Sequence, residues 1–166
     1  MWSRFKWPVF LTWVAVAHAA PVVTLTGPTS VGTGGAATLT VSLSGSAGTN
    51  MAALQFTITP PSGLTMAAPV LTPAWVAAGF AITCGPTHIC VVVNSKTVTP
   101  AIADGTVATI PVTISQACTP GATALPMTVI AATGPGYDAN ATVGTPYSIT
   151  VQQAPGIPTF IATMLR

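Results

Sequence analysis

The chain has 166 residues, of which only 4% are charged and 50% are hydrophobic, whereas about 25% of the residues in an ordinary soluble domain are charged. It contains 28 Thr, 16 Pro and 15 Gly, and it has no Glu. This composition excludes coiled coils and helical bundles, whose polar faces need Glu and Lys. The few cations exclude a nucleic-acid-binding surface. Abundant Thr and Val instead favour β-strands that place hydroxyl groups on the surface.

The first nineteen residues have the pattern of a secretory signal peptide. Arg4 and Lys6 precede an apolar stretch at residues 7–17, and the Ala-His-Ala sequence at residues 17–19 fits an A-x-A cleavage site. Because a membrane-spanning helix needs about 20 apolar residues, we expect cleavage after Ala19 and no membrane span in the secreted chain. An uncleaved membrane anchor is the alternative. Cleavage removes two cations and leaves two cations against two Asp, so the secreted chain has no net charge.

Short runs of alternating apolar and hydroxyl residues follow the leader. Within residues 37–44, Leu39, Val41 and Leu43 alternate with Thr and Ser, which predicts a strand with one buried face and one hydroxyl face. Phe56 takes an inward position in a second run of this kind. The same criteria predict nine strands, at residues 22–26, 37–44, 51–59, 64–70, 80–83, 89–94, 107–115, 127–131 and 147–152.

Nine strands without a strong helical pattern predict an all-β fold, a nine-stranded jelly-roll β-sandwich. We expect this domain to cover residues 20–153 and to be followed by a Pro- and Gly-containing tail at residues 154–166. Pro111 falls at an outward position of the 107–115 strand and cannot donate a backbone hydrogen bond. We therefore expect an edge strand or a β-bulge at Pro111.

Three segments of the chain carry a family resemblance. They are residues 50–60 with Leu64 following, residues 102–110, and residues 124–129 with the stretch through Gly136 and Asn140. In this order they resemble the third strand, the Asp-Gly turn with the seventh strand, and the eighth strand with its loop in the bacterial cohesin domain, the jelly-roll module of cellulosome scaffoldins. The resemblance covers about residues 22–152 and implies the cohesin fold, which is related to the sandwich of carbohydrate-binding modules.

The resemblance also implies a protein-binding face. Cohesins bind dockerins, which are small calcium-loaded helical modules, through a sheet face that includes the third, fifth and sixth strands. Two positions differ from scaffoldin cohesins: the outward third-strand residues are Ala53 and Gln55, and Pro60 replaces an acidic residue. The predicted partner-binding residues are Ala53, Gln55, Val91, Val93 and Lys96.

The expected secreted chain has few groups that could perform catalysis. Glycoside hydrolysis usually needs two facing carboxyls, and Asp104 and Asp138 are the two carboxylate side chains present. We expect Asp104 to cap backbone amides in a turn, whereas Asp138 and Asn140 offer fewer oxygens than a calcium ion needs. No Gly-x-Ser-x-Gly motif accompanies His88. We therefore predict no enzymatic activity, no metal and no cofactor.

The three cysteines fit an exported protein. Cys84 and Cys90 flank a short turn, which predicts a disulfide that closes a hairpin. A zinc site that includes His88 is the alternative, with three ligands at crowded spacing. Cys118 then has no disulfide partner within the chain. We expect it to be buried, and a disulfide to another chain is the alternative.

Two aromatic residues, Trp75 and Tyr137, are candidate contacts for a sugar or a protein partner. For Trp75 the alternative is packing over the end of the sandwich. The sequence as a whole predicts a secreted, non-catalytic module that attaches proteins at or outside the cell surface, with a dockerin-like or other extracellular protein as its partner. A system for polysaccharide degradation or adhesion is the expected setting. Direct polysaccharide binding and a structural subunit of a surface layer or filament are the alternatives.

Overall fold

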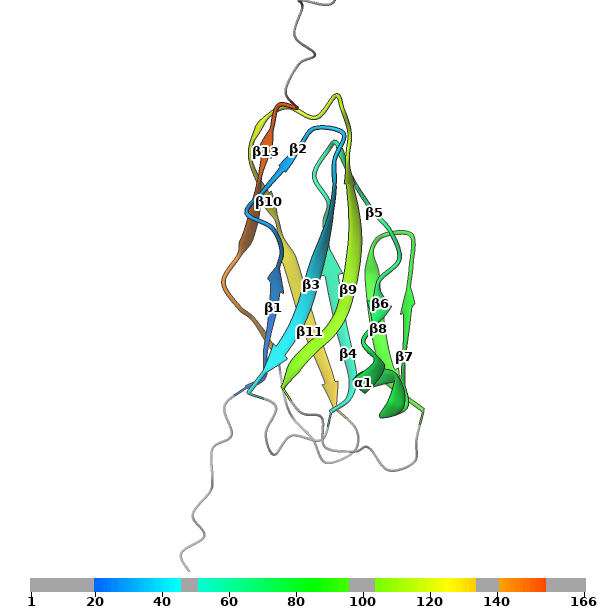
Figure 1. Cartoon of the computed structure of the whole chain (residues 1–166). Helices are drawn as coiled ribbons and strands as arrows, with labels where there is room; N and C mark the ends of the chain where they lie inside the picture. The colour runs from blue at the N-terminus through cyan, green and yellow to red at the C-terminus, as the bar shows by residue number, and fades with distance from the viewer. Residues whose placement is uncertain (1–19, 46–50, 96–103, 134–140, 155–166) are drawn as a thin grey trace, which may run out of the picture.

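The structure, a computed structural model, describes residues 20–45, 51–95, 104–133 and 141–154. In these ranges, thirteen strand segments and one short helix form a β-sandwich (Figure 1), which confirms the all-β fold class. The leader at residues 1–19 and the tail at residues 155–166 lie outside the described residues. Within the described ranges, no helix has the length and hydropathy needed to cross a membrane.

The strands form three hydrogen-bonded sheets. The first sheet has the order β12 (Thr142–Val143), β1 (Val22–Thr26), β3 (Ala36–Ser44), β9 (Gly105–Ile114) and β5 (Leu64–Met66), with β6 (Val70–Leu71) also paired to β9. The second has the order β11 (Met127–Thr133), β4 (Met51–Ile58), β8 (Ile89–Asn94) and β7 (Phe80–Cys84). The third has the order β10 (Gly121–Leu125), β13 (Tyr147–Gln152) and β2 (Ser30–Gly32).

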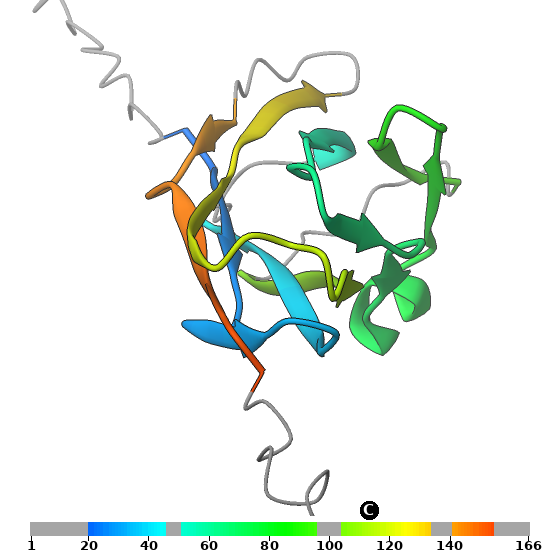
Figure 2. The same cartoon turned by 90° about the horizontal axis from the view of Figure 1, so that it is seen from above.

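The two larger sheets lie on opposite sides of the core, with β13 along one side and the helix α1 (Pro73–Ala77) on the other (Figure 2). The core follows the alternation of the sequence, because in a strand every second side chain points to the same face. The side chain of Phe56 lies in the core and is 1% exposed. The other fully buried large side chains come from both larger sheets and from β10 and β13, and they include Leu39, Leu43, Leu54, Ile58, Ile110, Ile114, Leu125 and Ile149.

All nine predicted strands are present, and the described residues contain further short segments. The predicted strand at residues 64–70 is divided into β5 and β6, which pair with different parts of β9. β2, β10 and β12 were not predicted, since two or three residues are too few to show alternation and β10 consists of Gly, Ala, Thr and Leu. Pro126 separates β10 from β11, and the chain passes there from the third sheet to the second.

Pro111 lies inside a sheet, so the prediction of an edge strand or a bulge at this residue is wrong. β9 pairs with β3 on one side and with β5 and β6 on the other, and its register irregularity lies between Val41 and Ser42 of β3. The carbonyl oxygen of Pro111 accepts a hydrogen bond from Ala67 N at 2.8 Å, between the β5 and β6 pairings. Because the nitrogen and the carbonyl of one residue point to the same side of a strand, the missing N–H faces this gap, where no regular ladder bond is lost.

Candidate functional site

The second sheet brings most of the predicted partner-binding residues onto one surface. Its register places Ala53 opposite Val93 and Gln55 opposite Val91. Leu54 and Phe56 of β4 point into the core, so the residues that alternate with them point outward. The outward residues also include Thr57, which pairs with Ile89, and we call Ala53, Gln55, Ile89, Val91 and Val93 the β4–β8 face. The fifth predicted residue, Lys96, lies outside the described residues.

Aliphatic side chains of β8 dominate the β4–β8 face. Ile89 is 39% exposed and Val93 is 44% exposed, with half-buried Val91 between them. The edge strand β7 continues the surface, because Ala81 pairs with Val93 and Thr83 pairs with Val91. None of the described residues of this sheet carries a formal charge. The face can therefore bind through apolar contact and through the amide of Gln55, and it offers no ion pair within the part of the sheet that the structure describes.

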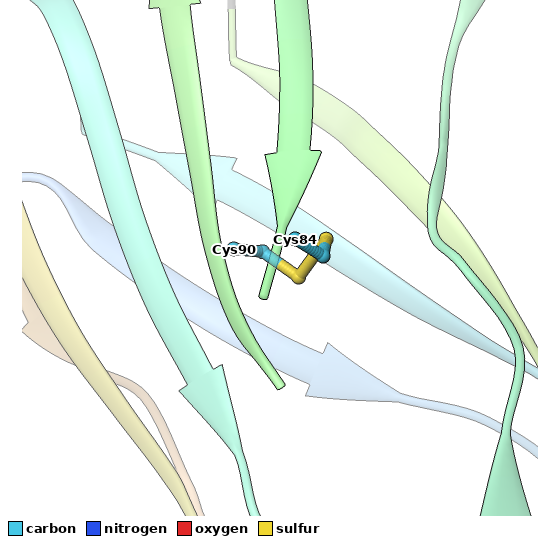
Figure 3. Close-up of a disulfide and its surroundings, with 2 residues drawn as sticks. All are labelled: Cys84 and Cys90. Atoms are coloured by element: carbon cyan, nitrogen blue, oxygen red, sulfur yellow. A yellow bond between two sulfur atoms is a disulfide. The ribbon is translucent and has the colours of Figure 1, made fainter. Parts of the chain in front are cut away.

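A disulfide closes the hairpin of β7 and β8, as predicted. Cys84 and Cys90 are directly opposite each other in the two strands and are bonded to each other (Figure 3). Gly85 N donates to the Ile89 carbonyl oxygen at 2.9 Å, and His88 N donates to the Gly85 carbonyl oxygen at 3.1 Å. The bond leaves neither cysteine as a thiolate ligand, so the zinc alternative is wrong. Among the described residues, no group of three or more His, Cys, Asp or Glu side chains is placed to hold a metal ion.

Trp75 is not available as an exposed aromatic contact, so this prediction is corrected. The residue lies in α1, which begins with Pro at its first position, a favoured place for Pro in a helix. Its side chain is 4% exposed, and its ring lies edge-on to Phe80 with ring centroids 4.8 Å apart. The packing alternative for Trp75 is therefore confirmed. Tyr137, the other candidate contact, lies outside the described residues.

Asp104 and Cys118 both have positions that fit a role in the fold rather than in a binding site. Asp104 accepts a hydrogen bond from Gly45 N at 2.9 Å through its Oδ2 atom, so it caps a backbone amide, although in the turn after β3 rather than in its own turn. Cys118 is a free cysteine that is 9% exposed, which confirms that it is buried. Asp138 and Asn140 lie outside the described residues.

The sequence did not predict a pocket at the tip of the disulfide hairpin. The pocket has a volume of about 220 Å³ and lies between residues 66–69 and the turn that contains His88. Its inner wall includes Phe56, Ile58 and Ile110. β8 begins at Ile89, opposite Thr57, so the hairpin turn at residues 85–88 continues past the last residue of β4, Ile58. No sequence pattern signals the pocket, because alternation gives the facing of a residue and not how a turn meets residues 66–69.

Comparisons with known proteins found similarity in structure. No protein-family model matches the chain, and no curated protein matches it in sequence. A cohesin of Clostridium acetobutylicum, CaCohA2, has a TM-score of 0.62 at 18% identity over 80% of this chain and 92% of that one. The third ScaB cohesin of R. flavefaciens, solved in complex with a group 1 dockerin, has a TM-score of 0.62 at 14% identity over 84% of this chain and 100% of that one.

A third similar structure is the non-cellulosomal cohesin of the archaeon Archaeoglobus fulgidus, with a TM-score of 0.58 at 10% identity over 81% of this chain and 93% of that one. The likeness therefore extends over most of this chain and nearly all of each module, and the similar structures include a module described as cellulosomal and one described as non-cellulosomal. Together with the ordered resemblance of three sequence segments, it shows that this chain has the fold of a divergent cohesin domain.

Proposed function

We propose that this chain is a secreted, non-catalytic attachment module whose β4–β8 face binds a dockerin-like helical protein. The observation that carries the proposal is the exposed aliphatic row of Ile89, Val91 and Val93 on the second sheet. This sheet contains the third, fifth and sixth predicted strands, which form the dockerin-binding face in the cohesins that the sequence resembles. A similar module has been solved in complex with a group 1 dockerin.

The spacing of this row suits a helix. Alternate side chains of a strand are about 6.6 Å apart, and residues i and i+4 of a helix are separated by about 6 Å along its axis. A helix that lies along β8 can therefore place one apolar side chain against each gap between Ile89, Val91 and Val93. Small neighbours on β4 and β7, Ala53 and Ala81, leave room for such a close approach.

The disulfide supports the proposed secretion, because disulfides form and persist in oxidising compartments outside the cytosol. Direct polysaccharide binding has less support. Sugar platforms need exposed aromatic rings, and Phe56, Trp75 and Phe80 are all buried. Tyr147 is half-buried, and its hydroxyl is bonded to a backbone carbonyl. A role in polysaccharide degradation would then come from the bound partner rather than from this domain.

The test is to immobilise the protein and capture partners from the secreted proteins of its source, with calcium or with a chelator. Wild type is compared with Val93→Lys on the β4–β8 face and with Thr38→Lys on β3. Both variants add one lysine at an exposed outward strand position, but Thr38 lies on the opposite sheet. Because Val93 is exposed, Val93→Lys should change the free energy of unfolding by about 0.5 kcal/mol or less.

We expect wild type and Thr38→Lys to capture the same partner with calcium and to release it with chelator. Val93→Lys should capture it at least about tenfold more weakly, since the partner would have to desolvate an ammonium group. Equal capture by both variants would refute binding through the β4–β8 face, and capture that does not depend on calcium would refute a dockerin-like partner.

A further inference from the structure

The pocket at the tip of the disulfide hairpin is a second candidate binding site, distinct from the β4–β8 face. Its inner wall is apolar, with Phe56, Ile58 and Ile110 from the two larger sheets. Its rim is formed by Met66 and residues 67–69 on one side and by the hairpin turn on the other. Strands of the two larger sheets and the disulfide-closed hairpin border this opening.

The size and lining of the pocket select for a small ring. An apolar cavity of about 150 Å³ is sufficient for benzene, and this pocket of about 220 Å³ leaves space for a substituted ring. An aromatic ring is favoured over an aliphatic one, since half-buried Met66 lines the pocket. A methionine sulfur attracts an aromatic ring beyond the effect of apolar burial.

His88 is the residue with a polar side chain among those that line the pocket. Its backbone has φ 58°, the one left-handed non-glycine residue in the described ranges, and strained residues of this kind cluster at ligand sites. The turn could have used Gly at no steric cost, but the residue here is His, which is half-buried and lines the pocket. A neutral imidazole can donate one hydrogen bond and accept another.

We propose that this pocket binds a small phenol, with the ring in the apolar part and the hydroxyl group hydrogen-bonded to His88. The ligand class follows from a volume suited to one substituted ring and from one polar side chain in the wall. The site is independent of the attachment function, because the β4–β8 face lies on the outer side of the sheet whereas Phe56 points to the inner side.

The experiment uses 4-fluorophenol and fluorobenzene as probes, observed by fluorine NMR, with backbone amide shifts of the protein recorded in parallel. We expect 4-fluorophenol to bind with a dissociation constant of about 1 mM or less. Amide shifts should be concentrated at Ala67, Ala68, Gly85 and His88. Ala68→Phe, at the rim, should weaken binding at least about tenfold, whereas Ala124→Phe on β10, the matched control at an exposed alanine, should not.

The variant His88→Gly separates the role of the imidazole from that of the apolar wall, and Gly accepts the left-handed backbone. It should weaken 4-fluorophenol about fivefold and leave fluorobenzene within about twofold of its wild-type affinity. Equal weakening of both probes would refute the hydrogen bond to His88. Absence of saturation, shifts spread away from the hairpin, or an unchanged affinity in Ala68→Phe with a native spectrum would overturn the site itself.

Discussion

Tyr147 joins the start of β13 to the loop that follows β1. Its hydroxyl donates a hydrogen bond of 2.6 Å to the Pro28 carbonyl oxygen, and its ring lies against Gly27, where an added Cβ would be 2.7 Å from the hydroxyl oxygen. Burial raises the pKa of Tyr147 above its ordinary value of 10.0, because the interior disfavours the phenolate. The neutral hydroxyl is therefore part of the folded structure.

This shift predicts a loss of stability in alkali. Above about pH 10 the unfolded chain releases the Tyr147 proton before the folded chain does, so the free energy of unfolding falls as pH rises through the folded-state pKa. Tyr147→Phe should cost about 1 kcal/mol at neutral pH, where the hydrogen bond is lost, and should reduce the decline between about pH 8 and pH 11. Urea unfolding at each pH measures the loss of stability at neutral pH and the alkaline decline, with Tyr137→Phe as the control. An unchanged alkaline slope in Tyr147→Phe would contradict the assignment.

At the scale of elements, the β7–β8 hairpin joins both proposed sites. Its outward residues Ile89, Val91 and Val93 belong to the β4–β8 face, and its turn forms one rim of the pocket. The disulfide between Cys84 and Cys90 closes a loop with a sequence separation of only 6. In the chain-entropy account, a loop this short contributes about 2 kcal/mol to stability, so the disulfide secures the hairpin while the core maintains the fold.

The double variant Cys84→Ala and Cys90→Ala should therefore lose about 2 kcal/mol of unfolding free energy and keep its β-sheet spectrum. Reduction of the wild type should have a similar effect, and reductant should not affect the double variant. Urea unfolding measured by circular dichroism gives these values. Complete unfolding of the double variant in water would show that the disulfide is required for folding, contrary to this account.

The elements also show what the sequence could and could not predict. Alternation over 8 to 10 residues in β3, β4 and β9 was enough to predict which side chains are buried. The five-residue helix around Trp75 and the two-residue strand β6 are too short for any periodicity to be visible. The β4–β8 face was predictable because it lies on regular strands, whereas the burial of Trp75 and the pocket depend on how separate elements meet.

At the scale of the whole molecule, the described chain starts at one end of the sandwich and leaves at the other (Figure 1). The β4–β8 face belongs to the second sheet, which runs along the side of the sandwich between these ends. Asp104 is the sole residue in the described ranges with a formal charge, and it precedes β9 of the first sheet. Long-range electrostatic attraction from the described part of the molecule is therefore minimal, and we expect the proposed binding through the β4–β8 face to come from contact.

Affinity for the captured partner should accordingly depend little on salt. Between about 50 mM and about 500 mM NaCl, the dissociation constant should change by less than about threefold, because screening acts on charge pairs and not on apolar contacts. Titration calorimetry at both salt concentrations measures this. A tenfold or greater weakening at high salt would contradict binding through an uncharged face.

The most direct test of the account is to map the bound surface by amide NMR of the labelled protein with the captured partner. We expect shifts and line broadening along β4, β7 and β8, centred on Val91 and Val93, with β1, β3 and β9 unchanged, because an apolar contact perturbs the residues that it covers. Perturbation centred on the outer residues of β3 and β9 would place the partner on the opposite sheet and contradict the assignment of the β4–β8 face.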